Sequence, residues 1–316
     1  MTTRIDPAIH RRARWRNIVN TWLIIAGLVA LLALTAWLLL GTGGVVWTAI
    51  LGFGFLVFGP QISPAMILRL YKARQLGPHH VPALWEVLEK LAARADLPAV
   101  PQLHYVPSAN MNAFAVGRRE DAAIAITDGL LRGLNLRQLT GVLAHEISHI
   151  ANGDIRVMAL ADIVNRLTGA LQTMGLLLLF FGLWQGGNAI LAAPVLILAP
   201  TFGALLQLAL SRSREYDADL EAAQLTGDPE GLASALATLE RRQGHMWESF
   251  VLPGSRIPDP SILRTHPPAE ERIRRLLALG GREYEPMEQR ERPLVLPGGY
   301  PRIVRRPRFH PHGLWY

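Results

Sequence analysis

Two long stretches of this 316-residue chain, residues 17–68 and 167–211, contain no charged side chain and no histidine. A helix crosses a bilayer in about 20 residues, so each stretch is long enough to cross twice. Each is interrupted by a polar or Gly-rich break, at Gly41–Gly44 and at Gln185–Asn188. The pattern predicts two helical hairpins, with membrane spans near Thr21–Leu40, Val45–Ile62, Thr168–Trp184 and Ala189–Leu210.

Basic residues flank both hairpins, whereas the hairpin tips are uncharged. By the positive-inside rule, both termini and the segment between the hairpins are expected in the cytoplasm of a multi-pass inner-membrane protein. A cleaved signal peptide is the alternative for the first span, but its length and the second span behind it favour a retained anchor. The flanking residues are Arg11, Arg12, Arg14, Arg16, Arg69, Lys72, Arg74, Arg156, Arg166, Arg212 and Arg214.

The more polar segments show shorter amphipathic patterns. Apolar residues at helical spacing predict helices over Val81–Ala95, Ser213–Gln224, Pro229–Gln243 and Pro268–Leu279. Alternating or compact apolar runs predict strands at Gln102–Val106, Asn112–Val116 and Ala122–Ile126, with a turn between the last two. The expected fold is mainly α-helical, with four transmembrane helices and an α+β domain built around a small antiparallel sheet.

The chain accordingly divides into six expected segments. Apolar hairpins are expected at 17–68 and 167–211, and the catalytic domain is expected in two parts, at 69–166 and 212–280. The tails are a basic one at 1–16 and a basic, Pro-rich one at 281–316.

The sequence His145-Glu146-Ile147-Ser148-His149 carries the clearest chemical signal. Apolar residues at helical spacing place it on an amphipathic helix, which Asn135 and Gln138 are expected to cap at its start. Histidines four residues apart project from one face of a helix and can bind one Zn²⁺. Glu146 is then placed as the general base of metal-assisted amide hydrolysis.

A catalytic zinc site needs a third protein ligand. Glu215 is the best candidate, and Asp219 one turn later could accept a hydrogen bond from the far nitrogen of a ligand imidazole. Glu221, on the same helix, is expected to leave zinc affinity unaffected. The alternative for this segment is an ordinary solvated helix in which the acidic residues pair with Arg212 and Arg214.

Four ordered motifs give the chain a resemblance to a known family: NAFA at 112–115, HEISHIANGD at 145–154, SRSREYDAD at 211–219 and THPPAEERI at 265–273. Together they resemble the HtpX group of membrane-bound zinc metallopeptidases, relatives of the CAAX prenyl proteases with a gluzincin-like catalytic domain. The resemblance implies that His145, His149 and Glu215 bind one zinc ion and that Glu146 is the base.

The resemblance also implies roles outside the zinc shell. His266 is expected to stabilise the tetrahedral intermediate, and Asn112, Ala113 and Phe114 are expected to hold an extended peptide by strand addition. Arg264 departs from the family pattern, which has a small polar residue before the THP sequence. Substrates are expected to be damaged or misfolded membrane proteins.

Composition narrows the partners. The chain has no cysteine, and its net charge of +7 is concentrated in the tails. A nucleic-acid-binding arm is conceivable for residues 281–316, but a solvated or headgroup-facing tail is favoured, and no nucleic-acid partner is expected.

Three rival functions stay open at this stage. They are an intramembrane-cleaving protease, a membrane scaffold or chaperone with a vestigial zinc site, and a prenyl-protein protease. The charged residues of the motif helix, Arg137 and Glu146, disfavour the first, because that helix does not read as a membrane span.

Overall fold

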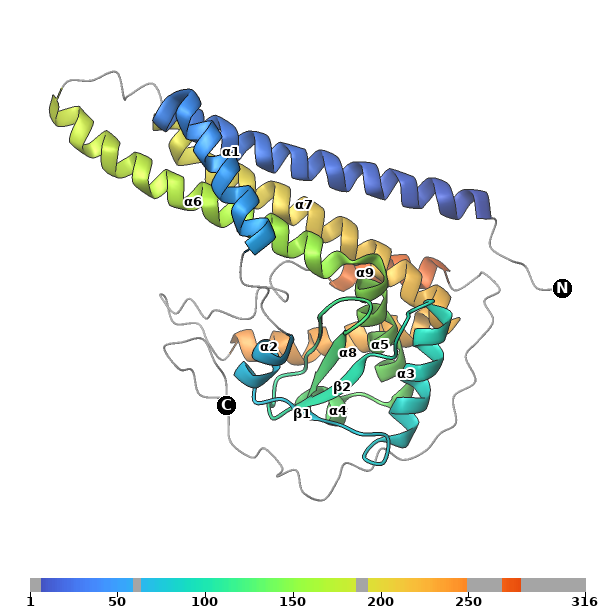
Figure 1. Ribbon diagram of the computed structural model, residues 1–316. Helices are drawn as coiled ribbons and strands as arrows, with labels where there is room; N and C mark the ends of the chain where they lie inside the picture. Colours follow the sequence, from blue (N-terminus) through green and yellow to red (C-terminus); the bar gives the residue numbers. More distant parts are fainter. Residues whose placement is uncertain (1–6, 59–63, 186–192, 249–268, 280–316) are drawn as a thin grey trace. The chain divides into compact units, whose positions relative to one another are not determined.

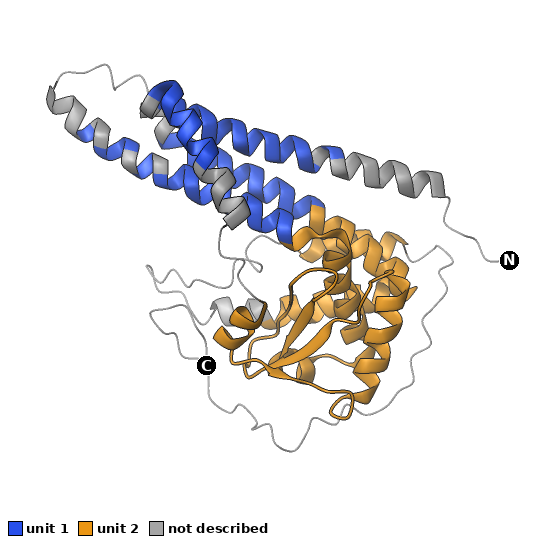
Figure 2. Cartoon of the chain, in the orientation of Figure 1, with its two compact units in different colours: residues 1–61, 156–213 blue, residues 62–155, 214–316 orange. Residues whose placement is uncertain are grey.

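The computed structural model describes residues 7–58, 64–185, 193–248 and 269–279. It divides into two compact units (Figure 2). The first unit consists of residues 1–61 and 156–213, and the second of residues 62–155 and 214–316.

The first unit contains α1 (Pro7–Phe58), most of α6 (Asp154–Gln185) and the first part of α7 (Ala193–Thr226). Gly41 divides α1 into two helices, since its φ of 64° and ψ of −156° lie outside the helical region. This break falls in the Gly-rich segment where the sequence predicts the tip of the first hairpin. Contacts among α1, α6 and α7 bury a small apolar cluster of Leu28, Leu32, Ala161, Val164 and Leu210.

Many large apolar side chains of this unit face outward instead of into that cluster, Trp22, Leu23 and Phe180 among them. Within the described residues, one helical stretch, Thr21–Leu38, is by itself long and apolar enough to cross a membrane, with a mean hydropathy of 2.2. The other three expected spans include residues whose side chains lie outside the description, so the four-span arrangement stays a prediction.

The second unit is built around a four-stranded sheet of order β1-β2-β4-β3 (Figure 1). Its strands are β1 (Arg74–Gln75), β2 (Gln102–Val106), β3 (Ala113–Val116) and β4 (Ala123–Thr127). Around it lie α2 (Pro64–Leu70), α3 (Pro82–Arg94), α4 (Asp128–Gly133), α5 (Leu136–Asn152), the end of α7, α8 (Pro229–Glu248) and α9 (Ala269–Leu279).

The expectation of an antiparallel sheet is wrong, because the sheet is mixed. β3 and β4 form the expected antiparallel hairpin, with Gly117 in the connecting turn at a φ of 96°. The second strand of that hairpin, β4, then pairs in parallel with β2. β3 is left at the edge of the sheet, so the strands that are neighbours in sequence, β2 and β3, are not neighbours in space.

Side chains that alternate along the strands fill two cores. Leu103 and Tyr105 of β2 join the main core, in which the apolar faces of α3, α5 and α8 also take part. Val106 lies on the other face, in a smaller cluster with Leu68 of α2 and Phe114 of β3. Strands β2, β3 and β4 are therefore buried on both sides, and the motif helix α5 packs within the larger core.

Helix α5 begins where the sequence predicts. Asn135 and Gln138 form a reciprocal capping box at its start, and Gly153 ends it in the left-handed conformation at a φ of 69°. Near its middle, Gly141 permits a close approach of α8. A β-carbon added at Gly141 would lie 2.8 Å from the backbone N and Cα of Leu232.

Replacing Gly141 with Ala should therefore destabilise the second unit by about 1–3 kcal/mol, because the obstructing atoms are backbone atoms that cannot rotate away. Thermal unfolding of the purified protein in detergent measures the effect. Gly169→Ala in α6 is the matched control, since nothing lies within 4 Å of its added β-carbon. Equal midpoints for the two variants would contradict the close packing of α5 against α8.

Candidate metal centre

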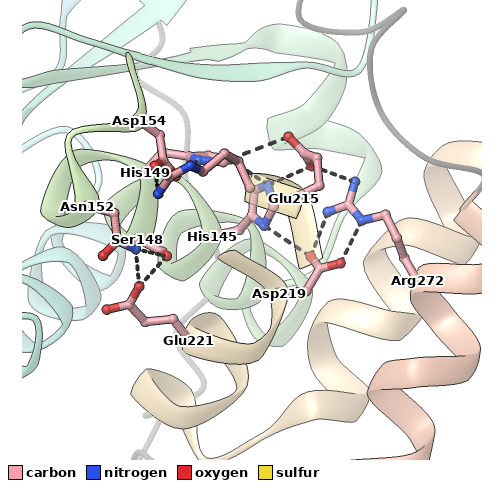
Figure 3. Close-up of polar contacts among 10 residues, drawn as sticks. His145, Ser148, His149, Asn152, Asp154, Glu215, Asp219, Glu221 and Arg272 are labelled. Atoms are coloured by element: carbon pink, nitrogen blue, oxygen red, sulfur yellow. Dashed lines mark hydrogen bonds and ion pairs between the residues drawn. The ribbon is translucent and has the colours of Figure 1, made fainter. Parts of the chain in front are cut away.

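Helices α5 and α7 bring the three predicted ligands together (Figure 3). Nε2 of His145 lies 3.2 Å from Nε2 of His149 and 3.3 Å from Oε2 of Glu215. Nε2 of His149 lies 3.5 Å from Oε1 of Glu215. Two nitrogens thus converge with the carboxylate of Glu215, which is 66 or more positions after either histidine in the sequence.

These separations fit a zinc ion. Bonds of about 2.0–2.1 Å in a tetrahedral shell place neighbouring ligand atoms about 3.3 Å apart. The three measured distances lie close to this value. Two imidazoles and one carboxylate are also the ligand set of one class of catalytic zinc sites, in which the fourth position stays open for water or substrate.

The far side of each imidazole contacts an aspartate. Nδ1 of His149 lies 2.8 Å from Oδ2 of Asp154, and Nδ1 of His145 lies 3.1 Å from Oδ1 of Asp219. A carboxylate there favours the tautomer with its proton on Nδ1, which leaves the lone pair of each Nε2 facing the other ligands. Lone pairs at such short range repel one another, so the arrangement calls for a cation between them.

Each aspartate is held in turn by an arginine. Arg272 of α9 contacts both oxygens of Asp219, at 2.6 and 2.7 Å, and lies 3.1 Å from Oε2 of Glu215. Arg214 lies 2.9 Å from Oδ1 of Asp154. Each imidazole is therefore backed by an Asp–Arg pair, and α9 is joined to the ligand helix α7 through Arg272.

The charges around the site leave room for a divalent cation. When ionised, Asp154, Asp219, Glu215 and Glu146 contribute four negative charges, and two arginines contribute two positive charges. One Zn²⁺ would balance the two negative charges that remain among these six groups. Asp219, Glu215 and Arg272 are each at most 5% exposed, so solvent does little to screen this imbalance.

The same contacts shift the pKa values of the buried groups. Burial lowers the pKa of the His149 imidazole, but its hydrogen bonds with Asp154 and Glu215 outweigh burial and raise the pKa well above its ordinary value. The pKa of His145 is raised in the same way through Asp219 and Glu215. Burial raises the pKa of Asp219, but the charge of Arg272 outweighs it and holds that pKa below its usual range. In the metal-free protein, protons thus compete with a metal for both imidazoles.

The other predicted site residues lie as follows. Glu146 is half-buried on α5 beside His145, and its charge acts on Arg272. Asn112, Ala113 and Phe114 lie at and just before the start of the edge strand β3. His266 lies outside the described residues, as does Arg264.

Asp154 and Arg272 belong to the site but were missed from the sequence. Asp154 follows Gly153, which ends α5, and no local sequence pattern marks its carboxylate as a hydrogen-bond partner of His149. Arg272 stands at the spacing of Leu276 and Leu279 on the apolar face of α9, where it is 4% exposed. A lone cation on the apolar face of a helix is a signal that could have identified it, because buried cations need partners.

Comparison with known proteins identifies the protein family. The family model described as "Peptidase family M48" matches residues 78–279. The chain belongs to peptidase family M48. Together with the ligand cluster, this makes the protein a metalloprotease.

Similar proteases support the resemblance to the HtpX group. The protease HtpX homologue of Salinibacter ruber is 36% identical over 278 residues, which cover 84% of this chain and 99% of that protein. The protease HtpX homologue of Pyrococcus furiosus is 37% identical over 275 residues, which cover 82% of this chain and 94% of that protein. The crystal structure of S. mikatae Ste24p aligns with a TM-score of 0.48 at 20% identity, over 84% of this chain and 66% of that protein.

In this M48 site, Asp154→Ala and Asp219→Ala should each lower zinc affinity by about 10–100-fold, because each removes the carboxylate beside Nδ1 of a candidate ligand imidazole. Glu215→Ala should lower it further, since it removes a ligand. Zinc content after dialysis against graded chelator measures the order. An equal loss of zinc affinity in Asp154→Ala and Glu215→Ala would contradict the assignment of Asp154 as a residue that orients His149 without binding the metal.

Proposed function

We propose that this protein is a zinc-dependent endopeptidase, anchored in the inner membrane, that hydrolyses peptide bonds in damaged or misfolded membrane proteins. The observation that carries the proposal is the convergence of His145, His149 and Glu215 at tetrahedral spacing, with Glu146 beside them on α5. When bound there, zinc would polarise the scissile carbonyl and acidify the attacking water.

Glu146 serves as the proton carrier in this proposal. It directly follows the first ligand on α5 but is not one of the three converging groups. Its half-buried carboxylate takes the proton of the attacking water and afterwards delivers it to the leaving amine. The charge of Arg272 lies close enough to this carboxylate to interact with it.

The edge strand β3 is the proposed docking site for an extended peptide. Both main-chain groups of Asn112 bond to Thr127, since its N–H donates to the Thr127 hydroxyl and its carbonyl accepts from the Thr127 N–H. Antiparallel pairing alternates along a strand, so the main-chain groups of Ala113 and Ala115 point away from β4. Ala113 then offers hydrogen bonds to substrate, and Asn112 contributes through its side chain. Phe114 supports the strand from the other face, where its ring packs on Tyr71.

His266 is proposed to stabilise the oxyanion of the tetrahedral intermediate. It precedes the first residue of α9, Ala269, by three positions. Even a fully extended chain spans at most about 11 Å over three residues. The same helix carries Arg272, which contacts Glu215. The attachment of α9 therefore supports a place for His266 near the ligands.

The membrane anchor consists of four spans with cytoplasmic termini and a cytoplasmic active site. Support comes from the two charge-free stretches, from their basic flanks and from the outward-facing Trp and Leu side chains of the first unit. Cleavage within the bilayer is disfavoured, because α5 packs in the core of the second unit and carries Arg137 and Glu146. The alternative of a prenyl-protein substrate is narrower. Comparing the cleavage of prenylated peptides with that of unfolded membrane proteins would distinguish it from the proposed function.

Glu146→Gln should keep one zinc per chain and lose nearly all proteolysis, because the amide cannot take the proton of the attacking water. Metal analysis and cleavage of an unfolded reporter protein in detergent measure both properties. Substantial residual cleavage would refute the role of Glu146. Intact zinc binding without any cleavage by the wild-type protein would favour the scaffold alternative.

The chain has no native cysteine, so single cysteines can report its topology. Thr42→Cys and Asn188→Cys, in the two hairpin tips, should react with an impermeant thiol reagent in intact cells whose outer membrane is permeabilised. Arg119→Cys and Ser255→Cys should react only after lysis, because the positive-inside rule places them in the cytoplasm. Labelling of Arg119→Cys before lysis would overturn the cytoplasmic active site.

A further inference from the structure

A second polar cluster joins the last turn of α5 to α7, and the proposed chemistry does not use it (Figure 3). Oε2 of Glu221 accepts a hydrogen bond of 2.6 Å from the Ser148 hydroxyl and another from Nδ2 of Asn152. Nδ2 of Asn152 also donates to the Ser148 hydroxyl at 3.3 Å. One carboxylate oxygen thus receives two donors that are one helical turn apart.

The Ser148 hydroxyl bonds to Glu221 instead of to a main-chain carbonyl of its own helix. Buried hydroxyls on helices often donate to the carbonyl four residues earlier, as Thr140 and Thr226 do here. Ser148 is fully buried and donates instead to Glu221, 73 residues away. The contact also places a carboxylate near the C-terminal end of α5, where the helix dipole is unfavourable to negative charge. Its role is therefore to hold two helices together.

The cluster lies close in sequence to residues that form the metal site. Ser148 directly precedes the ligand His149, and Asn152 is two residues before Asp154, which accepts from His149. On the other helix, Glu221 is six residues after the ligand Glu215 and two after Asp219. The contact thus ties the segment carrying His149 and Asp154 to the helix that carries the third ligand.

We propose that Glu221 is a positioning residue of the metal site, which holds His149 in register with Glu215 through Ser148 and Asn152. This inference rests on the proposed function, and it reverses the sequence-based expectation that Glu221 has no influence on zinc affinity. Metal affinity responds to ligand displacements of a few tenths of an ångström, so loosening the last turn of α5 affects the site without removing a ligand.

The test measures zinc affinity and the rate of zinc release to a chelator for the full-length protein in detergent. Glu221→Ala should weaken affinity about 10-fold or more and speed release, as the loss of other groups that orient ligands does. Glu221→Gln should behave like the wild type, because its amide oxygen can accept both hydrogen bonds that Oε2 accepts now. Glu240→Ala, at an exposed position of α8, is the matched control and should change neither quantity.

A double-mutant cycle identifies the contact itself. Ser148→Ala combined with Asn152→Ala should reproduce the effect of Glu221→Ala, and adding Glu221→Ala to that pair should cause little further loss. These variants also keep the test decisive if Glu221→Ala does not fold. Rescue by Gln separates positioning through an acceptor from an effect of negative charge.

Two results would overturn the inference: wild-type zinc affinity in folded Glu221→Ala, or an equal loss of affinity in Glu221→Gln. Failure of the wild-type protein to bind zinc at all would instead refute the proposed function. The affinity measurement requires no substrate, so the two failures are distinguishable.

Discussion

The structure of the second unit depends on one constraint: several ionised groups are buried around the two imidazoles, and each needs a partner of opposite charge or a hydrogen bond. Removing one partner from a buried ion pair costs about 3–5 kcal/mol, because an uncompensated charge is left behind. Arg272 meets this need for Asp219 and Glu215, and Arg214 meets it for Asp154. These pairings join α7 to α9 and to the first residue of α6.

The apolar core holds α5 rigidly, which the polar contacts do not do by themselves. α5 is capped at both ends and packs closely on α8 at Gly141, so its backbone offers a fixed frame for the two histidines. The ligand spacing then depends on how α7 lies against that frame. Apolar contacts therefore hold α5 in place, and the charged contacts determine how α7 lies against it.

The sequence revealed the parts of the site that depend on local periodicity. The His spacing, the capping box at Asn135 and the offset of Asp219 from Glu215 all follow from one helical repeat. In the structure the capping box is present and Asp219 lies 3.1 Å from Nδ1 of His145. Sheet order could not be predicted in this way, because nothing in the strand sequences states that β4 pairs with β2. Asp154 and Arg272 were missed for a similar reason, since their partners lie on other elements. The position of His266, the four transmembrane spans and the tails stay predictions.

The order of the ligands along the chain has a consequence for biosynthesis. His145 and His149 leave the ribosome before the apolar stretch 167–211, and Glu215 leaves it afterwards. A nascent chain that has not completed this stretch has two of the three ligands and lacks both Asp219 and Arg272. In the proposed mechanism, the metal site is therefore complete only after the second apolar stretch and the segment that carries Glu215, Asp219 and Arg272 have been made.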